Sequence, residues 1–303
     1  MSTFRWRGTA SSVWNLGGNW IDELGNVYAG GRYPGSMAGI FDDVILDTAV
    51  TNGINGYDAP GAGNEDLRSF KVTKLYDKGI GSLGTPLVLD VSGTGSESII
   101  DASAATVDFY LTGGGTYGFD RLSILDMAAT KKVYLYGRIG IGSIFKGQII
   151  LNTGVTVATL LHISYISSRI TDAAITIATG VTLTGPTIVN GGTTTCASAV
   201  TSLDIQDGDW GQIAGNMTTV RCLGGTVTWN AGNTTTLYAY GGSFSGASSV
   251  APRTLTTGYV FESATLNLAN GARSIIIGNR ILNMTGTATI ITDPGTSLVS
   301  LLP

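Results

Sequence analysis

A chain of 303 residues that is 43% hydrophobic and only 13% charged carries about half the charge of an ordinary soluble domain. Ser, Thr, Asn and Gly, or contacts with other subunits, must therefore cover much of its surface, and its 44 glycines lack the three-residue period of collagen. The net charge of −4 without a Lys/Arg cluster excludes a surface that follows a nucleic-acid backbone, and no apolar run suits a signal peptide or a membrane span.

The first fifty residues are rich in large aromatic side chains and do not follow the repeat found further on. Three of the five tryptophans fall within the first twenty residues. Large apolar side chains can close the open end of a stack of strands, or they can dock the protein on a partner. We favour the closing role and predict an N-terminal cap or anchor region over residues 1–50. A docking surface would use Arg5, Trp6, Trp14, Trp20, Tyr33 and Pro34.

A turn and a first strand lead out of this region. Asp42-Asp43 followed by Val-Ile-Leu-Asp47 is typical of such a transition. Its carboxylates could pair with Arg5, Arg7 or Arg32, although exposed ion pairs contribute little to stability.

A repeated phrase organises the chain from residue 51 onward. Ile149-Ile-Leu-Asn-Thr-Gly-Val-Thr-Val157 returns further along the chain as Ile175-Thr-Ile-Ala-Thr-Gly-Val-Thr-Leu183. Each copy alternates apolar and polar residues, as strands do, and ends at a glycine that can turn the chain at positive φ. Including weaker copies, the phrase glycines are Gly154, Gly180, Gly232, Gly271 and Gly295.

Short repeated strands favour a stacked architecture. A strand of five residues cannot bury its apolar face alone, but copies stacked in parallel about 4.8 Å apart form continuous apolar ladders. We therefore predict an all-β chain whose residues 51–303 form a right-handed parallel β-helix, or β-solenoid. Aligning Gly224-Gly225 with Gly241-Gly242 gives the shortest coil. An antiparallel sandwich stays open because hairpin-type Asn-Gly pairs occur at 52–53, 55–56, 190–191 and 270–271.

His162 is the only histidine, and it excludes a multi-histidine metal site. A Ser-His-Asp triad would have to use it with a serine such as Ser164 or Ser167, but no nucleophile-elbow sequence surrounds either serine. We predict a structural role for this histidine.

The two cysteines, Cys196 and Cys222, are separated by the same interval as the two copies of the repeated phrase. That interval matches one coil, so we expect them on adjacent rungs of one ladder. A disulfide is conceivable in that geometry, but a protein kept in the cytosol favours two buried thiols.

The densest acidic cluster is Asp204-Ile-Gln-Asp207-Gly-Asp209, followed by Trp210. Such a sequence is typical of a solvent-facing turn. Calcium binding and glycosidase chemistry, with two carboxylates as acid and base and Trp210 stacked on a sugar, are the alternatives.

Other cofactor and catalytic motifs are missing from the sequence. It has no Walker A motif, no dinucleotide fingerprint and no CxxC pair, and Gly113-Gly114-Gly115 is predicted as a turn because nothing helical follows it. We expect no catalytic, cofactor-binding or metal-binding residues and no enzyme.

Short Trp, Gly, Pro and Asp motifs follow one another through the first ninety residues: Trp6-x-Gly8, Trp14-Asn-x-x-x-Asn19-Trp20, Gly30-Gly31-Arg-x-Pro34, Phe41-Asp-Asp-Val-Ile-Leu-Asp47 and Tyr76-Asp-Lys-Gly79-Ile-Gly81-Ser-Leu-Gly84-Thr-Pro86-Leu-Val-Leu89. Their order resembles the start of β-helical structural proteins of tailed-bacteriophage virions. The resemblance covers roughly residues 6–90, and beyond that only the style of the repeat agrees. The chain departs from the pattern at Gly8-Thr9, where that family has Gly-Gly.

The resemblance implies a non-catalytic virion protein, assembled in the host cytoplasm without a signal peptide. We expect a capsid decoration (cement) protein, forming a homotrimer and binding the major capsid protein or other virion proteins, with no nucleic-acid or membrane partner. A tail fibre or spike that binds a surface polysaccharide is the first alternative, and a polysaccharide-degrading β-helix enzyme is the second. The repeat continues to Gly295, which disfavours a separate receptor-binding tip.

Overall fold

The fold is all-β, as predicted. The computed structural model describes residues 2–9, 11–12, 14–28, 32–36, 40–54, 66–91, 96–114, 118–163, 173–246, 252–261, 263–269, 275–284 and 288–293. Within these ranges the helical structure is one short 3-10 turn, η1 (Gly17–Asn19), and none of the helical structure found there could cross a membrane. The chain divides into two compact units, residues 1–157 and residues 158–303.

Strands of the first unit pair almost entirely in parallel. One series runs β1, β3, β4, β6, β8 and the C-terminal half of β9, and a second runs β5, β7, the N-terminal half of β9, and β10. The exception is the antiparallel pair β1–β2. The bounds are β1 (Thr3–Trp6), β2 (Trp20–Ile21), β3 (Asp42–Leu46), β4 (Asp66–Val72), β5 (Leu87–Val91), β6 (Glu97–Ala102), β7 (Phe109–Gly113), β8 (Phe119–Met127), β9 (Lys132–Ile144) and β10 (Gly147–Leu151).

A buried aliphatic ladder connects the turns of the first unit. Register places one apolar residue from each of five strands side by side, and all five are at most 1% exposed. These residues are Leu46, Val72, Ile100, Ile124 and Ile144. Because β1 and β3 already belong to this series, parallel pairing begins ahead of residue 51, where the sequence places the start of the repeats.

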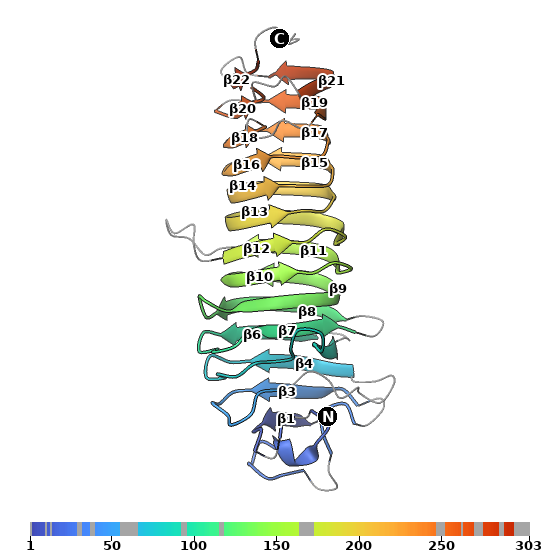
Figure 1. Cartoon of the computed structure of the whole chain (residues 1–303), viewed down its shortest axis with the longest axis vertical. Coiled ribbons are helices and arrows are strands. Elements are labelled where there is room, and N and C mark those ends of the chain that lie inside the picture. Colours follow the sequence, from blue (N-terminus) through green and yellow to red (C-terminus); the bar gives the residue numbers. More distant parts are fainter. Residues whose placement is uncertain are drawn as a thin grey trace. The chain divides into compact units, whose positions relative to one another are not determined.

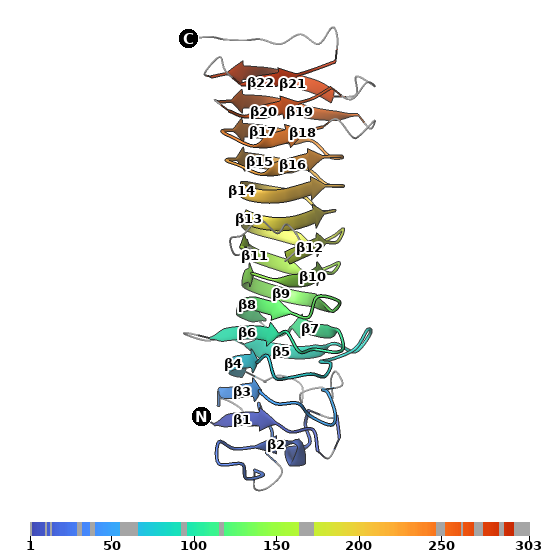
Figure 2. The same cartoon turned by 90° about the vertical axis from the view of Figure 1, so that its left-hand side faces the viewer.

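The second unit has the same organisation (Figures 1 and 2). One series contains β13, β14, β15, β17, β19 and β21, and the other contains β12, the C-terminal halves of β13 and β14, β16, β18, β20 and β22. β11 (Thr156–Ile163) begins at the end of the first unit. The other bounds are β12 (Ala173–Ile177), β13 (Thr182–Cys196), β14 (Val200–Gln212), β15 (Met217–Cys222), β16 (Thr226–Trp229), β17 (Thr234–Ala239), β18 (Ser243–Ser245), β19 (Arg253–Val260), β20 (Thr265–Asn267), β21 (Ile275–Asn283) and β22 (Thr289–Ile291).

Glycines close the turns where the repeat predicts them. Gly154, Gly180 and Gly232 have φ values of 84°, 82° and 74°, a conformation that L side chains adopt only at a cost, whereas Gly271 and Gly295 lie outside the described residues. The predicted alignment of Gly224-Gly225 with Gly241-Gly242 is also confirmed, because Thr226 pairs with Ser243 at the same offset as the aligned glycines.

The hairpin alternative at Asn190-Gly191 is wrong. These residues lie inside β13, and both halves of β13 pair in parallel with β14. A positive φ of 107° at Gly191 bends the strand and does not reverse it. The Asn-Gly pairs at 55–56 and 270–271 lie outside the described residues.

Candidate functional site

The three N-terminal tryptophans form one buried cluster. Trp20 lies at its centre, with ring centroids 4.9 Å from Trp6 and 4.7 Å from Trp14, both in edge-to-face orientation. The antiparallel pairing of β1 with β2 sets Trp6 opposite Trp20. Each indole N–H donates to a backbone carbonyl: that of Trp6 to Asn52, that of Trp14 to Pro34 and that of Trp20 to Trp14. A buried indole N–H needs a hydrogen-bond acceptor of this kind.

Burial separates the two interpretations of this region. The indoles are at most 2% exposed and Pro34 is also buried, so these side chains offer no surface to a partner. These four residues are therefore not available for docking in this structure, and their role in covering the end of the strands stays a prediction. Arg5 and Tyr33 remain partly exposed, and Arg5 forms an ion pair with Asp47.

Ion pairs fix the strand that leaves the cluster, as the sequence predicts. Arg32 Nη2 lies 2.9 Å from Asp42 Oδ1, and the Asp42 side chain is fully buried. The Arg32 guanidinium also stacks over Phe4, with Cζ 5.1 Å from the ring centroid. Arg5 and Arg7 both pair with Asp47.

One pairing was not predicted because its partner is distant in sequence. Asp43 accepts hydrogen bonds from Arg68 Nε at 3.0 Å and from Ser69 Oγ at 2.6 Å, both in the adjacent strand β4. Burial alone would raise the pKa of Asp43, but these hydrogen bonds outweigh it and leave the pKa below its usual value.

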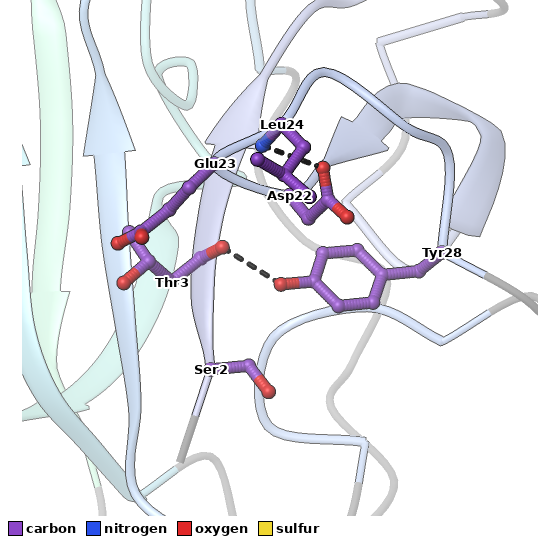
Figure 3. A pocket seen from close by; sticks show the side chains of 6 residues that line it. All are labelled: Ser2, Thr3, Asp22, Glu23, Leu24 and Tyr28. Carbon is purple, nitrogen blue, oxygen red and sulfur yellow. Dashed lines mark hydrogen bonds between the residues drawn. The ribbon is translucent and has the colours of Figure 1, made fainter.

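An open pocket of about 400 Å³ lies beside β1 (Figure 3). The Tyr28 hydroxyl donates to the Thr3 carbonyl at 2.8 Å, and Asp22 Oδ1 accepts the backbone N–H of Leu24 and of Asn26, each at 2.8 Å. The hydrogen bond from the Asn26 N–H leads the causes that lower the pKa of Asp22. These polar groups are therefore engaged in holding the loop. The lining residues are Ser2, Thr3, Asp22, Glu23, Leu24 and Tyr28.

The acidic cluster of β14 is divided between the two series of strands. Asp204 belongs to the first series, where its neighbours on adjacent turns are Ile188 and Arg221, and it pairs with Arg221 at 3.0 Å. Asp209 belongs to the second series, between Thr193 and Thr226.

The bend between these two acids is built locally. Asp207 Oδ1 accepts the N–H of Gly208 at 2.7 Å, and Gly208 has a φ of 84°. Among the residues that the structure describes, no group of three or more His, Cys, Asp or Glu side chains could hold a metal ion.

His162 is a buried member of β11. Its Nδ1 lies 2.8 Å from Thr194 Oγ1, and burial lowers its pKa to about 4. A neutral imidazole fixed by one hydroxyl fits the predicted structural role. Ser164 and Ser167 lie outside the described residues.

The cysteines are free thiols, but the prediction that they share a ladder is wrong. Cys196 pairs with Gln212 in the second series, whereas Cys222 pairs with Ile205 in the first. Register partners here are closer in sequence than the two cysteines are, since Asp204 pairs with Arg221, 17 residues further along. The partner of Cys196 in the next strand is therefore Gln212, and Cys222 belongs to the other series. Burial raises the pKa of each thiol to about 11.

A column of outward apolar side chains, which we call the corner stripe, was not anticipated from the sequence. It contains the residue that follows each of β15, β17, β19 and β21: Leu223, Tyr240, Phe261 and Met284. Tyr240 and Phe261 stack with centroids 4.4 Å apart. The sequence has an apolar residue directly after each of these four strands. That these residues form one column becomes apparent only when the strands are aligned by their register.

Comparison with known proteins identifies no relative: neither a protein-family model, nor a curated protein, nor a solved structure matches this chain.

Proposed function

We propose that the chain is a right-handed parallel β-helix that serves as a structural protein of a tailed-bacteriophage virion. In this proposal it is a decoration protein that binds the outside of the capsid as a homotrimer and stabilises it without catalysis. Two series of parallel strands, each paired from one strand to the next along the chain, and a buried aliphatic ladder support the β-helix.

The observation that carries the functional part is the arrangement of the N-terminal motifs. Residues far apart in sequence that carry the resemblance to virion proteins lie in one buried cluster and its supports, namely Trp6, Trp14, Trp20, Pro34 and Asp42. Motifs that pack together in one cluster form a single structural unit, which motifs scattered over a surface would not. This arrangement supports placing the chain in the same class as the virion proteins that it resembles.

The placement of the acids supports a structural role over a hydrolytic one. A β-helix hydrolase would bring two or three carboxylates together on one face in adjacent turns. Next to Asp204, the adjacent turns carry an isoleucine and an arginine, and next to Asp209 they carry threonines. The arginine already neutralises Asp204.

Immunogold labelling of virions from a phage that encodes this chain tests the proposal. We expect label on the head, and heads assembled without the protein should release their genome at a lower temperature. Label confined to the tail would replace the decoration role with the fibre alternative, and absence from purified virions would overturn the virion role. Cleavage of capsular polysaccharide that is lost in Asp207→Asn and Asp209→Asn variants would instead favour the enzyme.

A further inference from the structure

We infer that the corner stripe is the surface through which copies of this chain associate. The inference deepens the proposed function and rests on its homotrimer, because it names the surface that would form it. The stripe consists of Leu223, Tyr240, Phe261 and Met284, defined above.

Backbone hydrogen bonds hold the stripe in a straight column. The N–H groups of Leu223, Tyr240, Phe261 and Met284 donate to carbonyls one turn earlier, those of Ile205, Cys222, Ala239 and Val260, each at 2.8 Å. Leu223, Tyr240 and Met284 are 51%, 42% and 40% exposed. Apolar side chains at the equivalent position of four successive turns form a continuous patch, and exposed apolar patches mark interaction sites.

The orientation of the rings favours a protein partner over a sugar. Tyr240 stacks on Phe261, and the neighbouring column adds a second stack, Tyr238 on Tyr259, with centroids 4.9 Å apart and planes 7° apart. Rings that face one another along the column turn their edges outward, whereas stacking on a sugar requires an open ring face. Edges of Tyr and Phe beside Leu and Met are typical of the core of a protein interface.

Charge favours another copy of the same chain as that partner. Around a rotation axis parallel to the column, each residue near the axis meets its own copies, so any charged residue would face a like charge. The stripe has no charged member, and the residue one turn before Leu223, Gln206, is also uncharged. In the adjacent column, Asp204 and Arg221 neutralise each other.

The corner beside the stripe also consists of glycines, which carry no side chains, at two of its turns. The chain turns there through Gly224-Gly225 and Gly241-Gly242, where a Cβ on Gly225 or Gly242 would run into the backbone of the previous turn. Only these glycines separate β15 and β17 from the strands that follow, apart from Leu223 and Tyr240 themselves. A neighbouring copy can therefore approach the stripe without meeting a loop at these two turns.

Cysteine cross-linking of the full-length protein tests the assignment. In Tyr240→Cys, copies meeting at the axis should form covalent dimers under mild oxidation, since both native thiols are buried. The matched control is Ile213→Cys, at an apolar residue that is 49% exposed and follows β14 in the other series; it should stay monomeric on a non-reducing gel. Sedimentation should show an oligomeric wild type, a monomeric Tyr240→Asp and an oligomeric Ile213→Asp.

Each contrary result has a distinct meaning. A wild-type protein that sediments as a monomer at micromolar concentration overturns both the stripe assignment and the homotrimer, while head labelling reports separately on the virion role. An oligomer that cross-links through Ile213→Cys but not through Tyr240→Cys overturns the stripe assignment alone. If Tyr240→Asp lacks the wild-type circular dichroism spectrum, the cysteine pair decides the question.

Discussion

The side chain of Asn216 accepts the backbone N–H of Asn233 at 2.8 Å, one turn of 17 residues further along the chain. Asn233 in turn accepts the N–H of Thr254 at 2.8 Å. The two asparagines immediately precede β15 and β17, so each amide side chain holds the start of the next turn in place.

Removing one of these links should measurably destabilise the second unit. In Asn233→Ala the Thr254 N–H loses its acceptor, and we expect the free energy of unfolding to fall by about 1 kcal/mol. Asn233→Asp keeps an oxygen in the same place and should lose less. Urea denaturation measures both, and equal losses in the two variants would contradict the role of the hydrogen bond.

Close backbone packing should make Gly225 far less tolerant than other turn glycines. Gly225 has a φ of 64° and a Cβ there would run into Gly208, whereas Gly84, at a φ of 89°, has open space around it. Gly84→Ala should therefore cost only the backbone strain, about 1–2 kcal/mol. We expect Gly225→Ala to cost clearly more in chemical denaturation; a similar cost in both would mean that the neighbouring turn moves aside.

Truncating the central tryptophan should destabilise the N-terminal cluster. Trp20→Ala removes contacts with Trp6, Trp14 and Phe4, and losses of about 3–5 kcal/mol are typical for such a change in a core. Leu24→Ala, at a residue that is 87% exposed, should change stability by less than about 0.5 kcal/mol. Because the indoles are buried, loss of capsid attachment in Trp20→Ala should accompany loss of stability; loss of attachment at unchanged stability would restore the docking interpretation.

His162 should make stability fall as the pH is lowered. Its pKa drops from 6.5 to about 4 on folding, so between these values the unfolded chain binds more protons and stability rises with pH. The contribution is complete above pH 6.5 and is lost on the way down to pH 4, on the order of 3 kcal/mol in total. Denaturation of wild type and His162→Gln at several pH values isolates it; parallel curves would show that the imidazole titrates normally.

Both thiols should be inert in the folded protein. With pKa values of about 11 and buried sulfurs, neither Cys196 nor Cys222 should react with a disulfide reagent at pH 8, and both should react in guanidinium. Oxidation should leave no bond between them, because they belong to different strand series. A non-reducing mass that shows the pair linked would contradict this register.

Alternation and glycines in the sequence were enough to predict the all-β class, the turns at Gly154, Gly180 and Gly232, and the alignment of Gly224-Gly225 with Gly241-Gly242. They determine which side chains point inward, and this is a local property. Which residues become neighbours across turns depends on the length of every corner, and that length varies. The prediction from sequence therefore placed Cys196 and Cys222 wrongly relative to each other. It also did not include the corner stripe or the pairing of Asp43 with Arg68.

Prediction at the N-terminus had a similar limit. The pairing of Arg32 with Asp42, and of Arg5 and Arg7 with Asp47, follows from a few opposite charges in a short region, so it could be anticipated. The burial of the tryptophans could not be separated from docking, because a large apolar side chain suits both. The structure distinguishes them because the three indoles are buried against one another around Trp20.

Variable turn length gives the second unit a place for foreign sequence. The turn from Asn233 to Thr254 is longer than the turn from Asn216 to Asn233, and its extra residues fall between β18 and β19 while the ladders on both sides persist. An epitope grafted there would lengthen a connection whose length already differs from that of the turn before, whereas the same graft at the Gly224-Gly225 corner would force successive turns apart. The connection between β18 and β19 is thus the place for display, and the Gly224-Gly225 corner is the place that keeps the strands in register.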